Sequence, residues 1–181
     1  MQQILEYCPS LLLKGSLNDT ISKYYYDRLN HFQLFKYGCE NGDTQTIEYL
    51  IENDGTTIAK ENYFELACEV GDVQIVKLMI EKGATEWDWW NWNWGLQGAC
   101  LGGHLDLAKL MIEKGARGWD WGLDGACKGG HLDLVKLMIE KGARVWDWGL
   151  EGACIGGHLG LVQLMISKGA REWDWGLLSA C

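Results

Sequence analysis

The chain has 181 residues, of which 48% are hydrophobic and 23% are charged, a composition typical of a folded globular protein. Its net charge of -9 argues against a nucleic-acid partner, because affinity for a phosphate backbone comes from clustered lysine and arginine. No stretch approaches the roughly 18 uninterrupted apolar residues of a membrane span, and residues 1–15 lack the basic start of a signal peptide. We therefore expect an intracellular, cytoplasmic protein that binds neither nucleic acid nor membrane.

The N-terminal 30 residues differ from the rest of the chain and predict a helical cap. Residues 18–29 start with polar residues and continue with an amphipathic pattern, which predicts a helix that covers one end of the molecule.

From residue 95 onward the sequence repeats with a period of 27 residues. Residues 95–121 and 122–148 differ at four positions, and residues 149–175 follow the same pattern. Weaker copies occupy residues 31–59 and 60–94, and residues 176–181 begin an incomplete unit. A period of this length predicts a stacked array over residues 31–181, in which each unit buries its apolar face against its neighbours.

Each unit is expected to form two helices. In residues 122–148, Asp120 is placed to cap a first helix from Trp121 to Lys128, which Gly129-Gly130 ends. A second helix is expected over Leu132 to Lys141, with a left-handed stop at Gly142. This second helix is apolar around most of its circumference and must be covered on several sides. The predicted fold class is therefore all-α, a helical solenoid of stacked helix-turn-helix units.

The polar strip of the second helix is Asp133, Lys136 and Glu140, which we expect to face solvent. A leucine-rich repeat has a similar period, but its leucines alternate along a strand and it requires a ladder asparagine. The apolar spacing here is helical, and we reject that fold.

The unit resembles the ankyrin repeat, whose pattern is TPLHxAAxxGHxxVVxxLLxxGA. Residues 148–170 are WGLEGACIGGHLGLVQLMISKGA, with Ala153-Cys154, Gly157-His158 and Gly169-Ala170 matching in register. Trp-Gly replaces the Thr-Pro start, and the unit is about six residues shorter than the roughly 33 of the family. The shortened, tryptophan-rich copies resemble repeat proteins encoded by large DNA viruses of amoebae.

The resemblance implies several properties. The missing residues fall where ankyrin repeats project a β-hairpin finger, so the fingers would be truncated or absent. The family binds partner proteins on a concave face made by first helices and fingers. For a viral protein, the partner would be a host protein in the host cytoplasm.

Cysteine recurs at one position of the unit, in Cys100, Cys127, Cys154 and Cys181. Equivalent positions of stacked helices lie roughly 10 Å apart, beyond the roughly 7 Å limit for a disulfide. We therefore expect small buried thiols in a reducing compartment.

The repeated Cys-x-x-x-His, as in Cys127 and His131, has a spacing found in metal sites. Two glycines separate the residues and each unit offers only two ligands, whereas structural zinc requires four. The ankyrin resemblance implies instead that the histidine stabilises the turn between helices through backbone hydrogen bonds. A cysteine inside a packed helix also lacks the exposure that a thiolate nucleophile needs. We expect no metal, no cofactor and no enzymatic activity.

All 11 tryptophans lie between residues 87 and 175, and the pairs Trp119/Trp121 and Trp146/Trp148 recur in successive linkers. In an extended Trp-Asp-Trp segment both rings point the same way. Two interpretations stay open. The rings stack along the array in place of the missing finger, with the second tryptophan of each pair more buried, or they form an exposed ladder that binds a partner or a small ligand.

The linker at residues 85–95 has five extra residues, so this unit alone nearly reaches the ankyrin length. We expect it to form a projecting finger in which Trp90, Trp92 and Trp94 alternate with two asparagines, and to be a contact site for a protein partner.

The first helices are expected to supply the rest of the contact surface. Two of their positions vary between repeats, and these candidate protein-binding residues are Gln97, Asp124 and Glu151 at one position and Leu101, Lys128 and Ile155 at the other. Their glycine neighbours Gly98, Gly125 and Gly152 are expected to leave a shallow, accessible groove.

These features predict a non-catalytic scaffold that binds a protein partner through its concave face and its tryptophan-rich linker. The alternatives are small-ligand binding by an exposed tryptophan ladder and a role as a ubiquitin-ligase substrate adaptor. We expect a monomer, or weak self-association through the C-terminal end, where Leu177 and Leu178 would lie uncovered.

Overall fold

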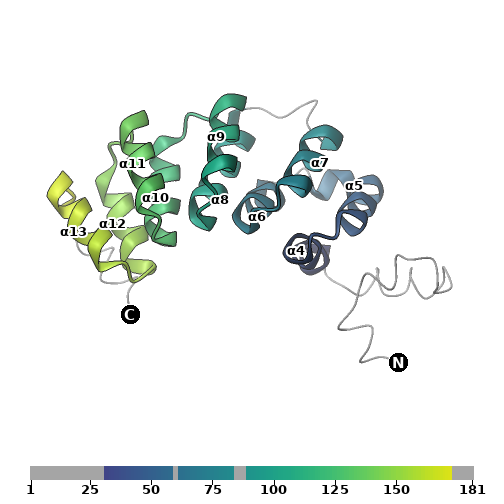
Figure 1. Cartoon of the computed structure of the whole chain (residues 1–181), viewed down its shortest axis with the longest axis horizontal. Coiled ribbons are helices and arrows are strands. Elements are labelled where there is room, and N and C mark those ends of the chain that lie inside the picture. The colour runs from purple at the N-terminus through teal and green to yellow at the C-terminus, as the bar shows by residue number, and fades with distance from the viewer. Residues whose placement is uncertain (1–30, 59–60, 84–88, 173–181) are drawn as a thin grey trace.

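The computed structural model describes residues 31–58, 61–83 and 89–172, and within these ranges it has ten helices and no strand (Figure 1). The described part of the fold is therefore all-α, as predicted. The expected cap helix at residues 18–29 and the incomplete unit at residues 176–181 lie outside these ranges. The helices are α4 (His31–Asn41), α5 (Thr44–Ile58), α6 (Glu61–Val70), α7 (Val73–Gly83), α8 (Trp89–Gly102), α9 (Leu105–Lys114), α10 (Trp119–Gly129), α11 (Leu132–Lys141), α12 (Trp146–Ile155) and α13 (Leu159–Lys168).

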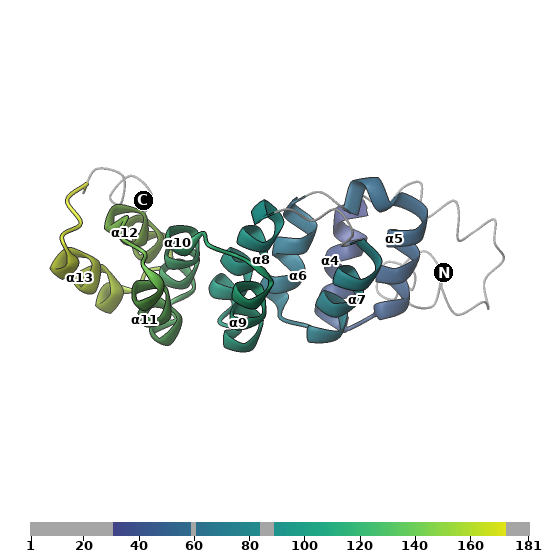
Figure 2. The same ribbon diagram turned by 90° about the horizontal axis from the view of Figure 1, so that it is seen from above.

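The helices from α6 to α13 alternate between two rows (Figure 2). The first-helix row consists of α6, α8, α10 and α12, and the second-helix row of α7, α9, α11 and α13. Neighbours in the first-helix row approach one another closely along their backbones, whereas no comparable approach joins α7, α9, α11 and α13. The described array is therefore curved, with the first-helix row on its inner side (Figure 1).

Glycine allows the close approach within the first-helix row. A Cβ atom on Gly125 would lie 2.6 Å from the carbonyl oxygen of Gln97, and one on Gly152 would lie 2.6 Å from the carbonyl oxygen of Asp124. A Cβ atom on Gly98 would likewise collide with the carbonyl of Glu65. The prediction that Gly98, Gly125 and Gly152 leave a shallow groove is wrong, because a neighbouring helix packs directly on each of them.

The second helix of the unit has the predicted bounds. It spans Leu132–Lys141, and Gly142 follows with a φ of 123°. The N–H of Ala143 donates to the carbonyl of Met138 at 3.0 Å, which is the hydrogen bond that closes a Schellman motif. A side chain at Gly142 would be strained in this left-handed conformation, which explains why every regular unit has glycine there.

The second helix is less completely covered than its sequence suggests. Leu134, Val135 and Met138 are buried, and the charged strip of Asp133, Lys136 and Glu140 is exposed as predicted. Leu132, however, is 44% exposed. The second helices are widely spaced, which leaves this side of α11 open to solvent. The helix is therefore covered on fewer sides than its apolar sequence predicts.

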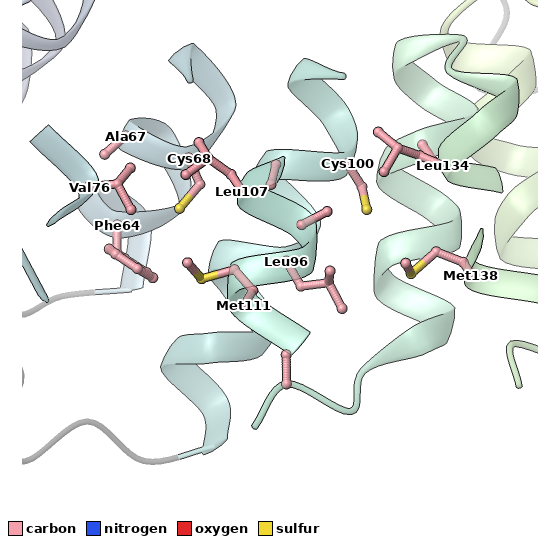
Figure 3. Close-up of a cluster of buried hydrophobic side chains, with 14 of the residues drawn as sticks. Phe64, Ala67, Cys68, Val76, Leu96, Cys100, Leu107, Met111, Leu134 and Met138 are labelled. Carbon is pink, nitrogen blue, oxygen red and sulfur yellow. The ribbon is translucent and has the colours of Figure 1, made fainter. Parts of the chain in front are cut away.

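A continuous apolar core runs between the two rows (Figure 3). From α8 onward the units contribute the same positions, so this part of the core is built from layers of nearly one composition. Its large, fully buried side chains are Leu96, Leu123 and Leu150 from the first helices and Leu107, Leu134, Met111, Met138 and Met165 from the second helices. Burial of one such side chain contributes about 1.5–3 kcal/mol, which makes this core the main source of stability.

Candidate protein-interaction surface

Each of the three linkers that follow α9, α11 and α13 is held by one side chain of the preceding first helix. Asp120 Oδ1 accepts the N–H groups of Arg144 and Val145 at 2.6 and 2.8 Å, and Asp147 Oδ1 accepts those of Arg171 and Glu172 at 2.6 and 2.9 Å. Asp120 lies in the first turn of α10, which begins at Trp119. The expected capping role of Asp120 and the expected start of the first helix at Trp121 are therefore wrong. The carboxylate instead fixes the next linker.

Asn93 performs the same task at the irregular junction. Its Oδ1 accepts the N–H groups of Arg117 and Gly118 at 2.7 and 2.8 Å, and the residue is only 1% exposed. Both Trp92 and Trp94 beside it are half-buried. The expected projecting finger is not formed over residues 89–95, because these residues, with Trp90, Trp92 and Trp94 among them, are the first turns of α8. Residues 84–88 lie outside the described ranges.

The pairs Trp119/Trp121 and Trp146/Trp148 lie on helices, so the two rings of a pair do not point the same way, as they would in an extended segment. Trp94 stacks on Trp121 with ring centroids 5.3 Å apart and the planes 30° apart. The guanidinium of Arg144 lies 5.9 Å from the ring centroid of Trp146. These contacts favour the packing interpretation over a free ladder. Trp148 is 44% exposed whereas Trp146 is half-buried, so the expected greater burial of the second tryptophan is wrong for this pair.

The predicted variable positions all lie on the first-helix row. Lys128 and Ile155 are exposed, and Gln97, Leu101, Asp124 and Glu151 are half-buried. Gln97 Nε2 donates to Asp124 Oδ2 at 3.4 Å across the gap between α8 and α10. The fold thus brings these six residues to one face, although they come from three different units.

Glu65 and Glu69 on α6 belong to the same face and were not among the predicted residues. They occupy the positions of Gln97 and Leu101 when the units are aligned on cysteine, so the alignment already contained the signal. The low similarity of this unit to the later ones concealed it.

The electrostatics of the face are dominated by carboxylates. Burial raises the pKa of the Glu65 carboxyl, and the charge of Glu69 adds to the increase. Burial also raises the pKa of Asp124, whereas the charge of Lys128 lowers it. Glu65 interacts electrostatically with both Asp124 and Lys128, which lie two first helices further along the row. These side chains therefore share one surface.

A small hollow extends this face at its C-terminal end. It is lined by Asp147, Trp148, Glu151 and Glu172. The exposed indole of Trp148 is the aromatic member of a wall that is otherwise acidic. The hollow is therefore suited to a cationic or amphipathic side chain of a partner.

Four of the five cysteines in the described part of the chain are buried thiols, as predicted. Cys39, Cys68, Cys100 and Cys127 are inaccessible, and Cys154 is half-buried. Burial raises the pKa of Cys100 and of Cys127 to about 12. A thiol with such a pKa is protonated at neutral pH and is a poor nucleophile.

His104 and His131 join neighbouring units. His104 Nε2 lies 2.9 Å from the carbonyl oxygen of Glu69, and His131 Nε2 lies 3.1 Å from that of Leu101, so each ring N–H donates to the preceding first helix. Backbone hydrogen bonding by these residues was predicted, but the acceptor lies in the neighbouring unit and not in the same turn. Among the described residues no group of three or more His, Cys, Asp or Glu side chains is arranged to hold a metal ion.

Comparison with family models and with curated proteins found no match for this chain. None of the helices in the described part of the chain is both long and apolar enough to cross a membrane.

Proposed function

We propose that this chain is an ankyrin-like solenoid that acts as a non-catalytic scaffold and binds a protein partner on its first-helix row. One observation carries the proposal. The core beneath this row is nearly identical from unit to unit, whereas the residues above it change in size and charge, as in Leu101, Lys128 and Ile155. A constant frame that presents varied side chains is a general basis for selective protein binding.

A catalytic function has little support. Cys100 and Cys127 are buried, and burial raises the pKa of each thiol to about 12. His104 and His131, which follow them, are engaged with backbone carbonyls of the preceding unit. A nucleophile and its general base must both reach a substrate, and neither side chain is available for this.

Small-ligand binding on a tryptophan ladder is also less well supported than protein binding. A stacking platform requires ring faces that are open to solvent. Trp94 and Trp121 cover each other instead, and Trp146 is half-buried. The exposed indole of Trp148 lies at one end of the described face, where it is well placed to contact a partner protein as one of several anchors.

Affinity capture from a eukaryotic cell lysate tests the proposal with two matched variants. Asp124→Arg/Glu151→Arg reverses two charges on the first-helix row, and Asp133→Arg/Glu140→Arg reverses two charges of the same residue types on the second-helix row. We expect the first variant to lose proteins that the wild type and the second variant both retain. Far-UV circular dichroism verifies that both variants are folded.

Equal capture by all three proteins would refute binding on the first-helix row. Loss only in the second variant would place the surface on the opposite side of the array. Recovery of ubiquitin-ligase subunits with the wild type and not with the first variant would identify the scaffold as a substrate adaptor.

A further inference from the structure

The two rows of helices carry opposite excesses of charge. Among the side chains that the structure describes, the first-helix row has six carboxylates and one lysine, whereas the second-helix row has five carboxylates and seven lysines. The carboxylates of the first-helix row are Glu65, Glu69, Asp120, Asp124, Asp147 and Glu151, and its lysine is Lys128. The negative charge of the described helices α6 to α13 is thus not spread evenly but is concentrated on the first-helix row.

The carboxylates of this row fall into two groups. Asp120 and Asp147 accept backbone N–H groups of the next linker and have a structural role. Glu65, Asp124 and Glu151 have no such role, and within the described part of the chain none of them forms a salt bridge. Carboxylates that are partly removed from water and are not held in an ion pair favour a cationic partner.

Apolar surface accompanies these charges. Ile155 and Trp148 are each 44% exposed. Leu101 is half-buried on α8, between the helices α6 and α10, which carry Glu65 and Asp124. Acidic and apolar groups therefore alternate along the row, which is the pattern that a segment with both basic and apolar side chains would complement.

We propose that the first-helix row binds a lysine- or arginine-rich segment of its partner protein, whose cations lie against Glu65, Asp124 and Glu151. This inference rests on the proposed function, since it assigns a chemistry to the partner of the same surface. The positive charge of Lys128 would repel the basic segment and therefore limits its affinity for the first-helix row.

Fluorescence anisotropy with labelled peptides tests the assignment on the full chain. The probes are a peptide of alternating arginine and alanine and, for comparison, peptides of alternating glutamate and alanine and of alternating glutamine and alanine. Titrations at ionic strengths of about 0.01 M and 0.15 M, where the Debye length is about 30 and 8 Å, measure the electrostatic part of binding. We expect only the arginine peptide to bind, and to bind more weakly at the higher ionic strength.

Neutral variants locate the binding surface. Glu65→Gln/Asp124→Asn/Glu151→Gln should weaken binding of the arginine peptide by about tenfold, since exposed ion pairs contribute about 0.2–1 kcal/mol each. The control Glu113→Gln/Asp133→Asn/Glu140→Gln removes the same charge from the second-helix row and should change the affinity by less than about twofold.

Two single-lysine variants provide a test in which binding of the arginine peptide is expected to become stronger and not weaker. Lys128→Gln should strengthen binding by about twofold to threefold, whereas Lys136→Gln on α11 should not. This outcome separates binding at the first-helix row from attraction to the overall negative charge.

Three results would overturn the proposal: no binding of the arginine peptide by the folded wild type, equal binding of the glutamate peptide, or equal weakening by the control variant. Lysate capture that still depends on Asp124 and Glu151 would then leave the scaffold function standing and refute only the basic partner. Failure of both experiments would refute the surface itself.

Discussion

The contact between neighbouring first helices depends on the absence of a side chain at Gly125. A Cβ atom there would lie 2.6 Å from the carbonyl oxygen of Gln97 and 3.3 Å from the backbone nitrogen of Leu101. Both are backbone atoms, so they cannot move aside by changing rotamer. Gly125→Ala therefore requires α8 and α10 to separate.

The size of the effect follows from two opposing terms. Overpacking of this kind costs about 1–3 kcal/mol. Alanine stabilises a helix interior by about 0.8–1.0 kcal/mol relative to glycine. The two terms leave a loss of up to about 2 kcal/mol in the free energy of unfolding. We expect Gly125→Ala to fall in the upper half of this range, because the atom that collides with the new Cβ belongs to the backbone of α8.

Gly160 is the matched control. It lies on α13, is exposed, and a Cβ atom there would meet nothing within 4 Å. Gly160→Ala should therefore raise the free energy of unfolding by about 0.5–1 kcal/mol through helix propensity alone. The same substitution thus has opposite signs at two positions of the array.

Urea unfolding, followed by far-UV circular dichroism and tryptophan fluorescence, measures both changes. A Gly125→Ala variant as stable as the wild type would refute the close approach of α8 and α10. A shallower transition for this variant would further indicate that the units on either side no longer unfold together.

Three further predictions concern single side chains. Asn93→Ala leaves the N–H groups of Arg117 and Gly118 without their acceptor and should lower the free energy of unfolding by about 1–3 kcal/mol, which an unchanged urea midpoint would contradict. Burial raises the pKa of the Asp124 carboxyl in the folded state above 3.8, so ionisation of this carboxyl lowers the free energy of unfolding as the pH rises through the folded-state pKa. Asp124→Asn should therefore be more stable than the wild type at pH 7. Urea unfolding below pH 3.8 should show no difference between the two proteins. Cys100, whose pKa burial raises to about 12, should resist iodoacetamide in the native protein and react in denaturant, as peptide mass spectrometry can determine; rapid native alkylation would show that the thiol is accessible.

Much of the unit could be predicted from local pattern. The second helix was predicted at Leu132–Lys141, which are the bounds of α11, because an apolar helical spacing and a following glycine are signals within one segment. The burial of cysteine in the packed first helix could be predicted for the same reason. The first helix was predicted to begin at Trp121, because Asp120 has the side chain of an N-cap. That carboxylate instead accepts hydrogen bonds from a linker 24 and 25 residues away, which no local pattern reveals.

The candidate surface was only partly predictable. The variable residues Gln97, Asp124 and Glu151 could be found by aligning the units, and they share one face. The surroundings of these residues could not be predicted from the sequence. The glycine that follows each of them is compatible both with an open groove and with a close contact between helices. The prediction of a projecting finger was wrong for a similar reason. Alternation of tryptophan and asparagine over residues 90–94 suggests an extended segment. These residues lie instead on α8, where the buried side chain of Asn93 accepts hydrogen bonds from the next linker.

The sequence by itself determined the 27-residue period, the helical class and the left-handed glycine that ends the second helix of each regular unit, because these depend on residues within one unit. The tertiary structure decided which side of each helix meets its neighbour and therefore where charge accumulates. Glu65 and Lys128 are 63 positions apart in the chain and interact only because three first helices stack closely on glycine. The acidic inner face is thus a property of the stack, since no single unit contains more than a part of it.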